Sequence, residues 1–232
     1  MTTQLAHRLF NVDEYHQMAD AGILDEDSNV ELIEGELLLL HPEAGRPPGS
    51  LRLFNIDEYY RMAEFGILDA DDRVELIEGE IVEMAPIGGR HAATVTRLTK
   101  LLSVSAGNRA DVSIQNPVKL SDLSVPQPDA ALLLPVVARD NRLATAGDVL
   151  LIVEVADTTL ESDREIKLPL YARAGVPEVW IIALNDDAIE AYRQPSMTGY
   201  GTKLVAKRGE ILAPLALPQL ELAVDEVLGP RA

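Results

Sequence analysis

Two carboxylates stand at positions where a hydrophobic core would normally reject a charge. Asp129 is the second residue of the apolar segment 128–135, and Glu154 lies within 149–156, which is otherwise apolar. An ionised carboxylate in such a strand is unfavourable unless it meets a cation or hydrogen-bond donors. If the two segments are neighbouring strands, both acids face one space and could hold Mg²⁺ or Mn²⁺ together with water and phosphate oxygens. The alternative is a Glu154 that pairs with an Arg or Lys at the end of a sheet.

Lys167 is a third residue that could take part in chemistry at this place. Asp163, Lys167 and Tyr171 are spaced by four residues, so they share one face of a helix that follows Glu154. A lysine there can orient a water molecule or offset charge that develops on a phosphate. An ordinary helix salt bridge is the alternative. Pro169 removes a helical hydrogen bond and would clash with the carbonyl four residues before it, so the helix either kinks or begins later.

The spacing of apolar residues predicts the elements that must position these side chains. Helices are expected over 91–104 and 162–175. Apolar or alternating patterns predict strands over 111–120, 128–135, 149–156 and 176–184, and a hairpin from 188–194 and 201–207. Three consecutive strands, a crossover helix and further strands predict an α/β (α+β) fold with a mixed β-sheet flanked by helices.

The N-terminal third is a direct repeat. Residues 9–38 resemble residues 53–82, with equivalent positions 44 apart. Each copy is typical of a short helix, with Asn11 or Asn55 as its N-cap, and then a strand or a tight hairpin that turns at Glu78–Gly79 in the second copy. Only the second copy continues into the rest of the fold. We therefore expect residues 1–50 to be an extra copy with a linker and 51–232 to be the main domain. The extra copy could add a strand, mediate a dimer or be a poorly anchored duplicate.

The composition narrows the class of protein. The 232 residues carry a net charge of −18 and no Cys, which excludes disulfides, thiolate zinc sites and a cysteine nucleophile. Residues 1–84 hold 5 Arg, no Lys and 20 acids, so the acidity belongs to the repeat and phosphodiester chemistry is not excluded elsewhere. No apolar run is long enough for a membrane span and no leader pattern begins the chain, which favours a cytoplasmic protein. A modest basic face, or else a solvated mixed-charge face, is expected from Arg90, Arg97, Lys100, Arg109 and Lys119.

From about Leu53 to Val227, the chain resembles the Uma-two family of restriction-type endonucleases, which belongs to the PD-(D/E)XK nuclease superfamily. Each matching string is short, but the ordered set spans most of the chain. The matching residues are VELIEGEIV at 74–82, His91, Pro128–Asp129, Glu154 in LIVEVAD, Asp163, Lys167 and Tyr171 in DREIKLPLY, and AGVPEVWII at 174–182.

The resemblance implies a restriction-endonuclease-like fold and hydrolysis of phosphodiester bonds in DNA that depends on Mg²⁺ or Mn²⁺. It implies that Asp129 and Glu154 are the metal ligands and that Glu75 is a third acid of the catalytic group. The strand lysine of the superfamily would stand at Ala156 here, and the family pattern instead assigns its role to Lys167.

The resemblance also implies substrate contacts and an assembly. Tyr171 is expected at the substrate, and His91 either contacts a phosphate or caps its helix. A homodimer is expected by analogy, because cutting both strands of DNA generally needs two sites.

Two departures from the family pattern motivate a different hypothesis. Asp157 and Thr158 stand where the family has a small hydroxyl residue and then Pro, and Pro169 lies between Lys167 and Tyr171. The alternative is therefore a catalytically inactive binding or assembly module on the same fold. In that case the acidic repeat would face a protein partner or cover the DNA groove.

Overall fold

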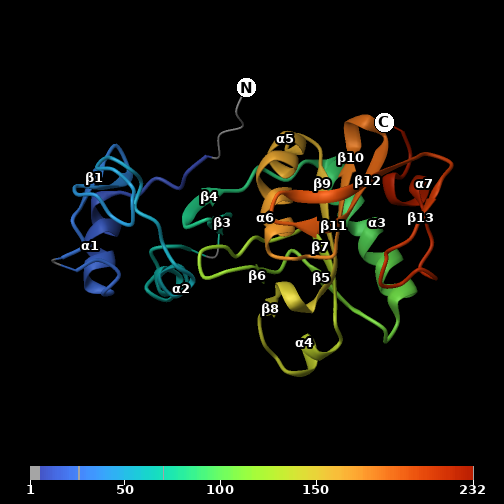
Figure 1. Ribbon diagram of the computed structural model, residues 1–232, viewed down its shortest axis with the longest axis horizontal. Helices are drawn as coiled ribbons and strands as arrows, with labels where there is room; N and C mark the ends of the chain where they lie inside the picture. Colours follow the sequence, from blue (N-terminus) through green and yellow to red (C-terminus); the bar gives the residue numbers. More distant parts are fainter. Residues whose placement is uncertain (1–5, 26, 70, 232) are drawn as a thin grey trace. The chain divides into compact units, whose positions relative to one another are not determined.

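The computed structural model describes residues 6–25, 27–69 and 71–231, which divide into two compact units (Figure 1). The repeat unit comprises residues 6–84 and Ser121–Val125, and the sheet unit comprises residues 85–120 and 126–231. The division falls at residue 84, whereas the sequence led us to expect residue 50. The physical reason is that the two copies of the repeat pair with each other, as described below.

In the repeat unit, each copy folds into a helix followed by a two-stranded hairpin. The elements are α1 (Val12–Asp20), β1 (Val30–Ile33), β2 (Glu36–Leu39), α2 (Ile56–Glu64), β3 (Val74–Ile77) and β4 (Glu80–Glu83). Asn11 and Asn55 cap the two helices, as predicted, and each forms a reciprocal capping box with a glutamate three residues later. The second hairpin turns through Glu78 and Gly79, whose φ angles of 50° and 88° suit a two-residue turn.

The sheet unit is built on a six-stranded sheet with the order β12-β11-β10-β9-β7-β5. Its strands are β5 (Asp111–Ile114), β7 (Ala130–Leu133), β9 (Val149–Ala156), β10 (Glu178–Ala183), β11 (Ala188–Ser196) and β12 (Gly199–Lys207). The neighbours β9 and β10 are parallel and the other neighbours are antiparallel, so the sheet is mixed, as predicted.

The expected strand over 111–120 is divided into two. Pro117 separates β5 from β6 (Val118–Lys119), because proline has no N–H to donate to a strand ladder. The strand β6 pairs instead with β8 (Ala144–Thr145). The loop after β6 belongs to the repeat unit, where the N–H of Val125 donates to the carbonyl of Leu76 at 2.8 Å.

The remaining elements of the sheet unit are mostly helical. They are α3 (Gly89–Ala106), α4 (Val136–Arg139), the 3₁₀ turns η1 (Ala146–Asp148) and η3 (Leu184–Asp186), α5 (Leu160–Ser162), the π-helical turn η2 (Asp163–Lys167), α6 (Leu168–Arg173), β13 (Ile211–Leu212), β14 (Leu222–Ala223) and α7 (Val224–Leu228). Within residues 6–25, 27–69 and 71–231, no helix is long and apolar enough to cross a bilayer.

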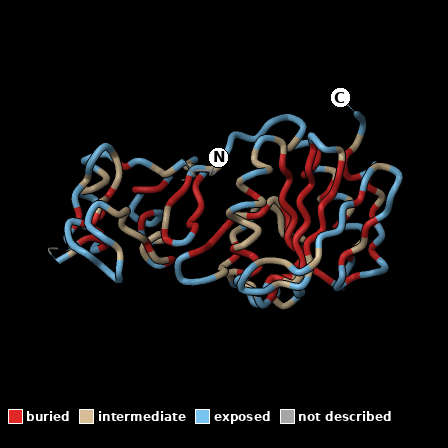
Figure 2. Tube along the Cα trace, turned by 45° about the horizontal axis from the view of Figure 1, so that its top comes forward, coloured by how far each residue is buried: buried red, intermediate tan, exposed pale blue. Residues whose placement is uncertain are grey.

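Helices pack on both faces of the central strands, and β9 and β10 are buried along almost their whole length (Figures 1 and 2). One hydrophobic cluster joins α3 to alternate residues of β9 and contains Leu98, Leu102, Leu151, Val153 and Val155. The opposite cluster joins α6 to the intervening residues and contains Ile152, Ala156 and Tyr171. Because successive strand side chains point to opposite faces, Glu154 belongs to the α6 face.

Candidate metal-binding active site

Asp129 and Glu154 are neighbours at the carboxyl end of β9. The strand β7 runs antiparallel to β9 with Ala130 opposite Val153, which brings Asp129 beside Glu154. Oδ2 of Asp129 accepts a hydrogen bond of 2.8 Å from the N–H of Val155, and this bond fixes the Asp129 carboxylate against the strand. The two acids that the sequence suggested would share one space therefore lie on adjacent strands at one end of the sheet.

Glu154 is the most deeply buried acid of this group, with 4% of its side chain exposed. Its Oε1 accepts a hydrogen bond of 2.6 Å from the hydroxyl of Tyr171 and lies 3.7 Å from Nζ of Lys167. Burial raises the pKa of Glu154 to about 8. The Lys167 charge and the Tyr171 hydroxyl oppose this rise, whereas the charges of Asp163 and Asp129 add to it. A carboxyl whose pKa is raised in this way is mostly protonated at neutral pH, and a bound cation would favour its ionised form.

The π-helical turn η2 explains how Lys167 reaches this place despite Pro169. The N–H of Leu168 donates to the carbonyl of Asp163, five residues back, so the turn is wider than an α-helical one. A wider turn accommodates a proline at the start of α6, where its missing N–H and bulky ring would otherwise disturb an α-helix. The sequence led us to expect a kink or a later start. The structure instead absorbs Pro169 in a π-turn and keeps Asp163 and Lys167 beside Glu154.

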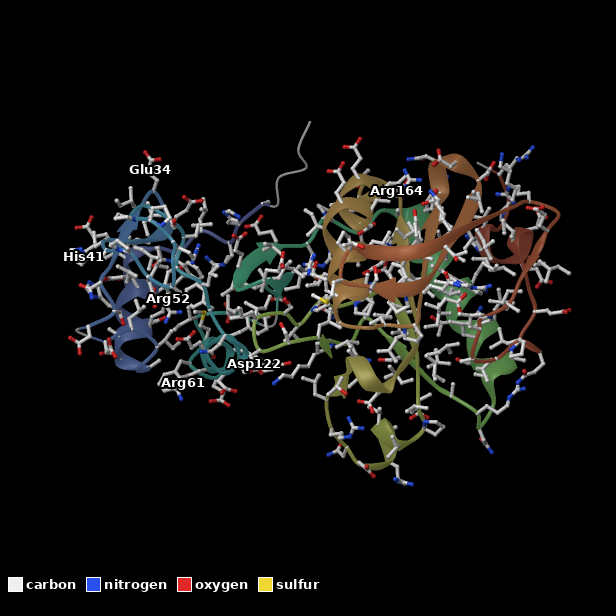
Figure 3. The ribbon with its side chains drawn as sticks, in the orientation of Figure 1. Glu34, His41, Arg52, Arg61, Asp122 and Arg164 are labelled. Carbon is white, nitrogen blue, oxygen red and sulfur yellow. The ribbon has the colours of Figure 1, made fainter. Side chains whose placement is uncertain are left out.

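Arg164, labelled in Figure 3, lies in the same π-turn and anchors it to β11. Sequence reasoning missed this contact. Its guanidinium binds both oxygens of Glu190, with N–O distances of 2.9 Å from Nε and 2.6 Å from Nη2. Lys203 and Tyr192 also contact the Glu190 carboxylate, at 2.8 Å and 2.6 Å. The available signal was an acid at an inward position of an apolar strand, the same signal that singled out Glu154.

His91 contacts the Asp129 carboxylate and does not cap its helix. Nε2 of His91 lies 3.0 Å from Oδ2 of Asp129. The helix α3 begins at Gly89 and its N-cap, Gly88, provides no side-chain hydrogen bond. Of the two roles left open for His91, capping is therefore wrong, and contact with a phosphate stays a prediction.

Asp157, the extra acid after Glu154, is held by a cation. Its Oδ1 lies 3.3 Å from Nη1 of Arg90, which also donates to Asn185. Arg90 thus offsets at least part of the negative charge that Asp157 adds near the site.

Four arginines line a cavity of about 580 Å³ next to the N-terminus of α3. Asp187 is the one acid among its lining residues, and the arginines are Arg90, Arg97, Arg208 and Arg231. The cavity also borders η3, which follows the carboxyl end of β10, so it lies at the same end of the sheet as Glu154. Of the basic face expected from the sequence, only Arg90 and Arg97 contribute, and the other two arginines come from the C-terminal third.

Two further residues that the sequence predicted at the site, Tyr171 and Glu75, are placed differently from the others. Tyr171 is completely buried, so it has no exposed surface for a substrate, and the geometry gives it the role of holding Glu154 through its hydroxyl. Glu75 is buried in β3 of the repeat unit, whereas the other acids lie in the sheet unit. Its participation stays a prediction.

The donor set fits a hard divalent cation with few protein ligands. Each carboxylate accepts a described hydrogen bond through one oxygen, Oδ2 of Asp129 and Oε1 of Glu154, and each has further lone pairs that can bind a cation. In the described part of the chain, no group of three or more His, Asp or Glu side chains has the arrangement of a metal site. Two carboxylates with water suit Mg²⁺ or Mn²⁺, because Mg²⁺ usually retains several waters and binds one or two protein carboxylates.

The model of the Uma2 family, described as "Putative restriction endonuclease", matches residues 56–225. The chain belongs to the Uma2 family. The match begins inside the second copy of the repeat, so the first copy lies outside it. A comparison with curated proteins finds no match.

A solved structure shares the fold of this Uma2 family member. It is a crystal structure of a "putative nuclease belonging to DUF820" from Anabaena variabilis ATCC 29413, with a TM-score of 0.61 and 14% identity. The similarity covers 75% of this chain and 97% of the other. It confirms the predicted mixed α/β fold, and membership of the Uma2 family supports a nuclease-like function.

Proposed function

We propose that the protein is a metal-dependent endonuclease that hydrolyses phosphodiester bonds of DNA, with Asp129 and Glu154 as ligands of Mg²⁺ or Mn²⁺. The observation that carries this proposal is the buried Glu154 carboxylate beside Asp129, with Lys167 as its partner. Burying this much negative charge without a further cation is unfavourable. When bound, a divalent cation polarises the scissile phosphate and lowers the pKa of an attacking water.

The chain's own residues have distinct roles in this proposal. Tyr171 holds the Glu154 carboxylate in place through its hydroxyl. Lys167 stands 3.7 Å from that carboxylate, where its ammonium group can orient water or offset charge on the phosphate in the transition state. His91 contacts Asp129 and has 15% of its side chain exposed, so it can fix the Asp129 carboxylate or approach a phosphate.

The arginine-lined cavity supports a polyanionic substrate. Nucleic-acid affinity comes largely from Arg and Lys at backbone phosphates, and this chain is strongly acidic as a whole. Four arginines therefore converge at the same sheet end as Glu154 in an otherwise acidic chain. Arg90 pairs with Asp157, and Arg208 pairs with Asp187 and Asp225, so these acids offset part of the positive charge. We propose that this cavity receives backbone phosphates next to the scissile bond.

The test is a plasmid-cleavage assay with Mg²⁺ or Mn²⁺ on the intact chain and on the variants Asp129→Asn and Glu154→Gln. Both variants should lose cleavage and lose the Mn²⁺ binding that calorimetry detects. Their thermal midpoints should be equal to or above that of the wild type, because each removes an acid from a crowded acidic site. Asp140→Asn is the matched control, since Asp140 is half-exposed and pairs with its neighbour Arg139.

Unchanged cleavage by either variant would refute the assignment of these ligands. If the intact chain neither cleaves DNA nor binds Mn²⁺, the hypothesis of an inactive binding or assembly module is favoured. The ion pair between Glu154 and Lys167, with the hydrogen bond from Tyr171, would then only stabilise the fold.

A further inference from the structure

In the repeat, the segment that leads into each helix pairs with the hairpin of the other copy. The N–H of Arg8, which leads into α1, donates to the carbonyl of Ile81 on β4 at 2.8 Å. The N–H of Arg52, which leads into α2, donates to the carbonyl of Leu37 on β2 at 2.7 Å. The segment before each helix therefore pairs with the hairpin of the other copy through an antiparallel β-bridge.

This pairing is reciprocal, residue by residue. Arg8 and Arg52 are equivalent positions, 44 residues apart, and so are Leu37 and Ile81. The flanking hydrogen bonds follow the same rule: the N–H of Glu83 donates to Ala6, and the N–H of the equivalent Leu39 donates to Ser50. The isolated bridges are also equivalent, pairing His7 with Val82 and Leu51 with Leu38. Each contact from the first copy to the second is thus matched by the same contact from the second copy to the first. An interface with this property has two-fold symmetry.

A pseudo-two-fold axis passes between Phe10 and Phe54. These equivalent rings meet edge to face, with centroids 6.2 Å apart. Each ring also lies under the arginine two positions before it, Arg8 at 5.2 Å and Arg52 at 4.5 Å. A small cavity of about 30 Å³ on the axis is lined by five pairs of equivalent residues, namely His7 and Leu51, Arg8 and Arg52, Phe10 and Phe54, Glu36 and Glu80, and Leu37 and Ile81.

The contacts within the first copy also recur at the equivalent residues of the second copy. Pairing between the copies therefore does not distort the fold of either one. Arg8 pairs with Glu14 at 2.6 Å and Arg52 pairs with Glu58 at 2.6 Å. The hydroxyl of Tyr15 donates to the carbonyl of Val30, and the hydroxyl of Tyr59 donates to that of Val74. Each copy is thus a complete unit whose leading segment and aromatic ring complete its counterpart.

We propose that the first copy is a built-in substitute for a second subunit. It covers, within one chain, a two-fold interface on the second copy that is made by Arg52, Phe54, Glu80, Ile81 and the edge of β4. The partner that this surface fits is the same helix–hairpin unit from another copy of the chain. The family match begins at Ile56, inside the second copy, so the first copy lies outside the family pattern and the duplication supplies its counterpart in cis.

The surface is closed in the intact chain because the linker holds the two copies together. A short linker gives an effective concentration in the millimolar range, well above ordinary protein concentrations. The intact chain should therefore not self-associate through this surface. A substitution confined to the first copy should open it, and the second copies of two chains should then pair around a true two-fold axis.

The test compares the mass of intact-chain variants by sedimentation over a range of protein concentrations. Phe10→Lys places a third cation beside Arg8 and Arg52, which should release the first copy and give a concentration-dependent doubling of mass relative to the wild type. Phe10→Lys/Phe54→Lys damages the surface of the second copy as well and should return to the wild-type mass. Val12→Lys is the control, because Val12 is in the same copy with 61% of its surface exposed.

A second measurement covers the case in which Phe10→Lys weakens folding. Phe54→Lys retains an intact first copy and Phe10→Lys retains an intact second copy, so a mixture of the two can form one native interface between chains. Association in the mixture, or in Phe10→Lys alone, supports the proposal when the double variant remains at the wild-type mass. Self-association of the double variant, or no association of either the single variant or the mixture, overturns it.

Discussion

At the scale of single residues, two buried glutamates on one sheet have opposite electrostatic environments. Glu154 meets one lysine at 3.7 Å among other acids, and its pKa rises. Glu190 meets the bidentate guanidinium of Arg164 together with Lys203 and Tyr192. The three hydrogen-bond partners of Glu190 indicate a structural role, whereas Glu154, with one lysine among neighbouring acids, has the surroundings expected of the proposed metal site.

The acid dependence of stability should carry the signature of Glu190. Burial alone would raise the pKa of this carboxyl, but its three hydrogen-bond partners lower it to about 2. Because the folded pKa lies below the unfolded one, this stabilisation is present above about pH 4.5 and is lost as the pH falls toward 2. The difference in the free energy of unfolding between wild type and Glu190→Gln, from urea titrations, should shrink over this range. A constant difference would contradict the assignment.

At the scale of elements, the π-turn η2 is the device that places Lys167. It is tied to β11 through Arg164, while Lys203 contacts the same Glu190 carboxylate from β12. Both substitutions Arg164→Gln and Lys203→Gln remove one cation from Glu190, but only the first releases the π-turn.

Arg164→Gln should therefore lower kcat for DNA cleavage with little change in KM, because Lys167 loses its position while the arginine-lined cavity is intact. Lys203→Gln should lower stability and leave kcat close to the wild-type value. Steady-state cleavage kinetics below both melting transitions distinguish the two variants. Equal losses of kcat would show that Glu190, and not the π-turn, is the relevant element.

The hairpins of the repeat unit depend on a close approach at their glycines. A Cβ at Gly79 would lie 2.7 Å from Cβ of Leu53, whereas a Cβ at Gly209, with a similar φ of +87°, would meet open space. Gly209→Ala should cost about 1–2 kcal/mol of stability from backbone conformation alone. Gly79→Ala should cost more, because Leu53 must also shift. Urea denaturation of the two variants tests this, and equal losses would rule out the steric contribution.

At the scale of the whole molecule, charge is segregated between the repeat and the remainder. The repeat is strongly acidic, and the arginine-lined cavity lies in the sheet unit. A DNA substrate is attracted by such a cavity only locally, so binding should be weak and strongly dependent on salt.

Arg90→Gln/Arg231→Gln should weaken DNA binding and reduce the slope of log affinity against log salt by about 2, near one for each arginine removed. Fluorescence anisotropy with a metal-free duplex measures this slope. Arg139→Gln is the control, because Arg139 is similarly exposed and lies outside the cavity. An unchanged slope would place the DNA elsewhere on the protein.

The local elements, the mixed sheet and the two candidate acids could be predicted from the amino-acid sequence. Runs of apolar residues predicted β9 and β10, and Asn11 and Asn55 predicted where the two helices begin. These predictions succeed because each signal depends on only a few neighbouring residues. The proximity of Asp129 to Glu154 followed from treating their strands as neighbours. Their side-chain types, in strands that exclude charge, were sufficient to single them out.

Contacts between segments far apart in the sequence could be found only from the folded chain. The anchoring of Arg164 to Glu190, the four-arginine cavity and the pairing between the two copies all join such segments. In the repeat, the sequence of one copy is equally compatible with two arrangements. The segment before each helix could pair with the hairpin of its own copy or with the hairpin of the other copy. The choice is made by packing between the copies, around Phe10 and Phe54, which no pattern within one copy records.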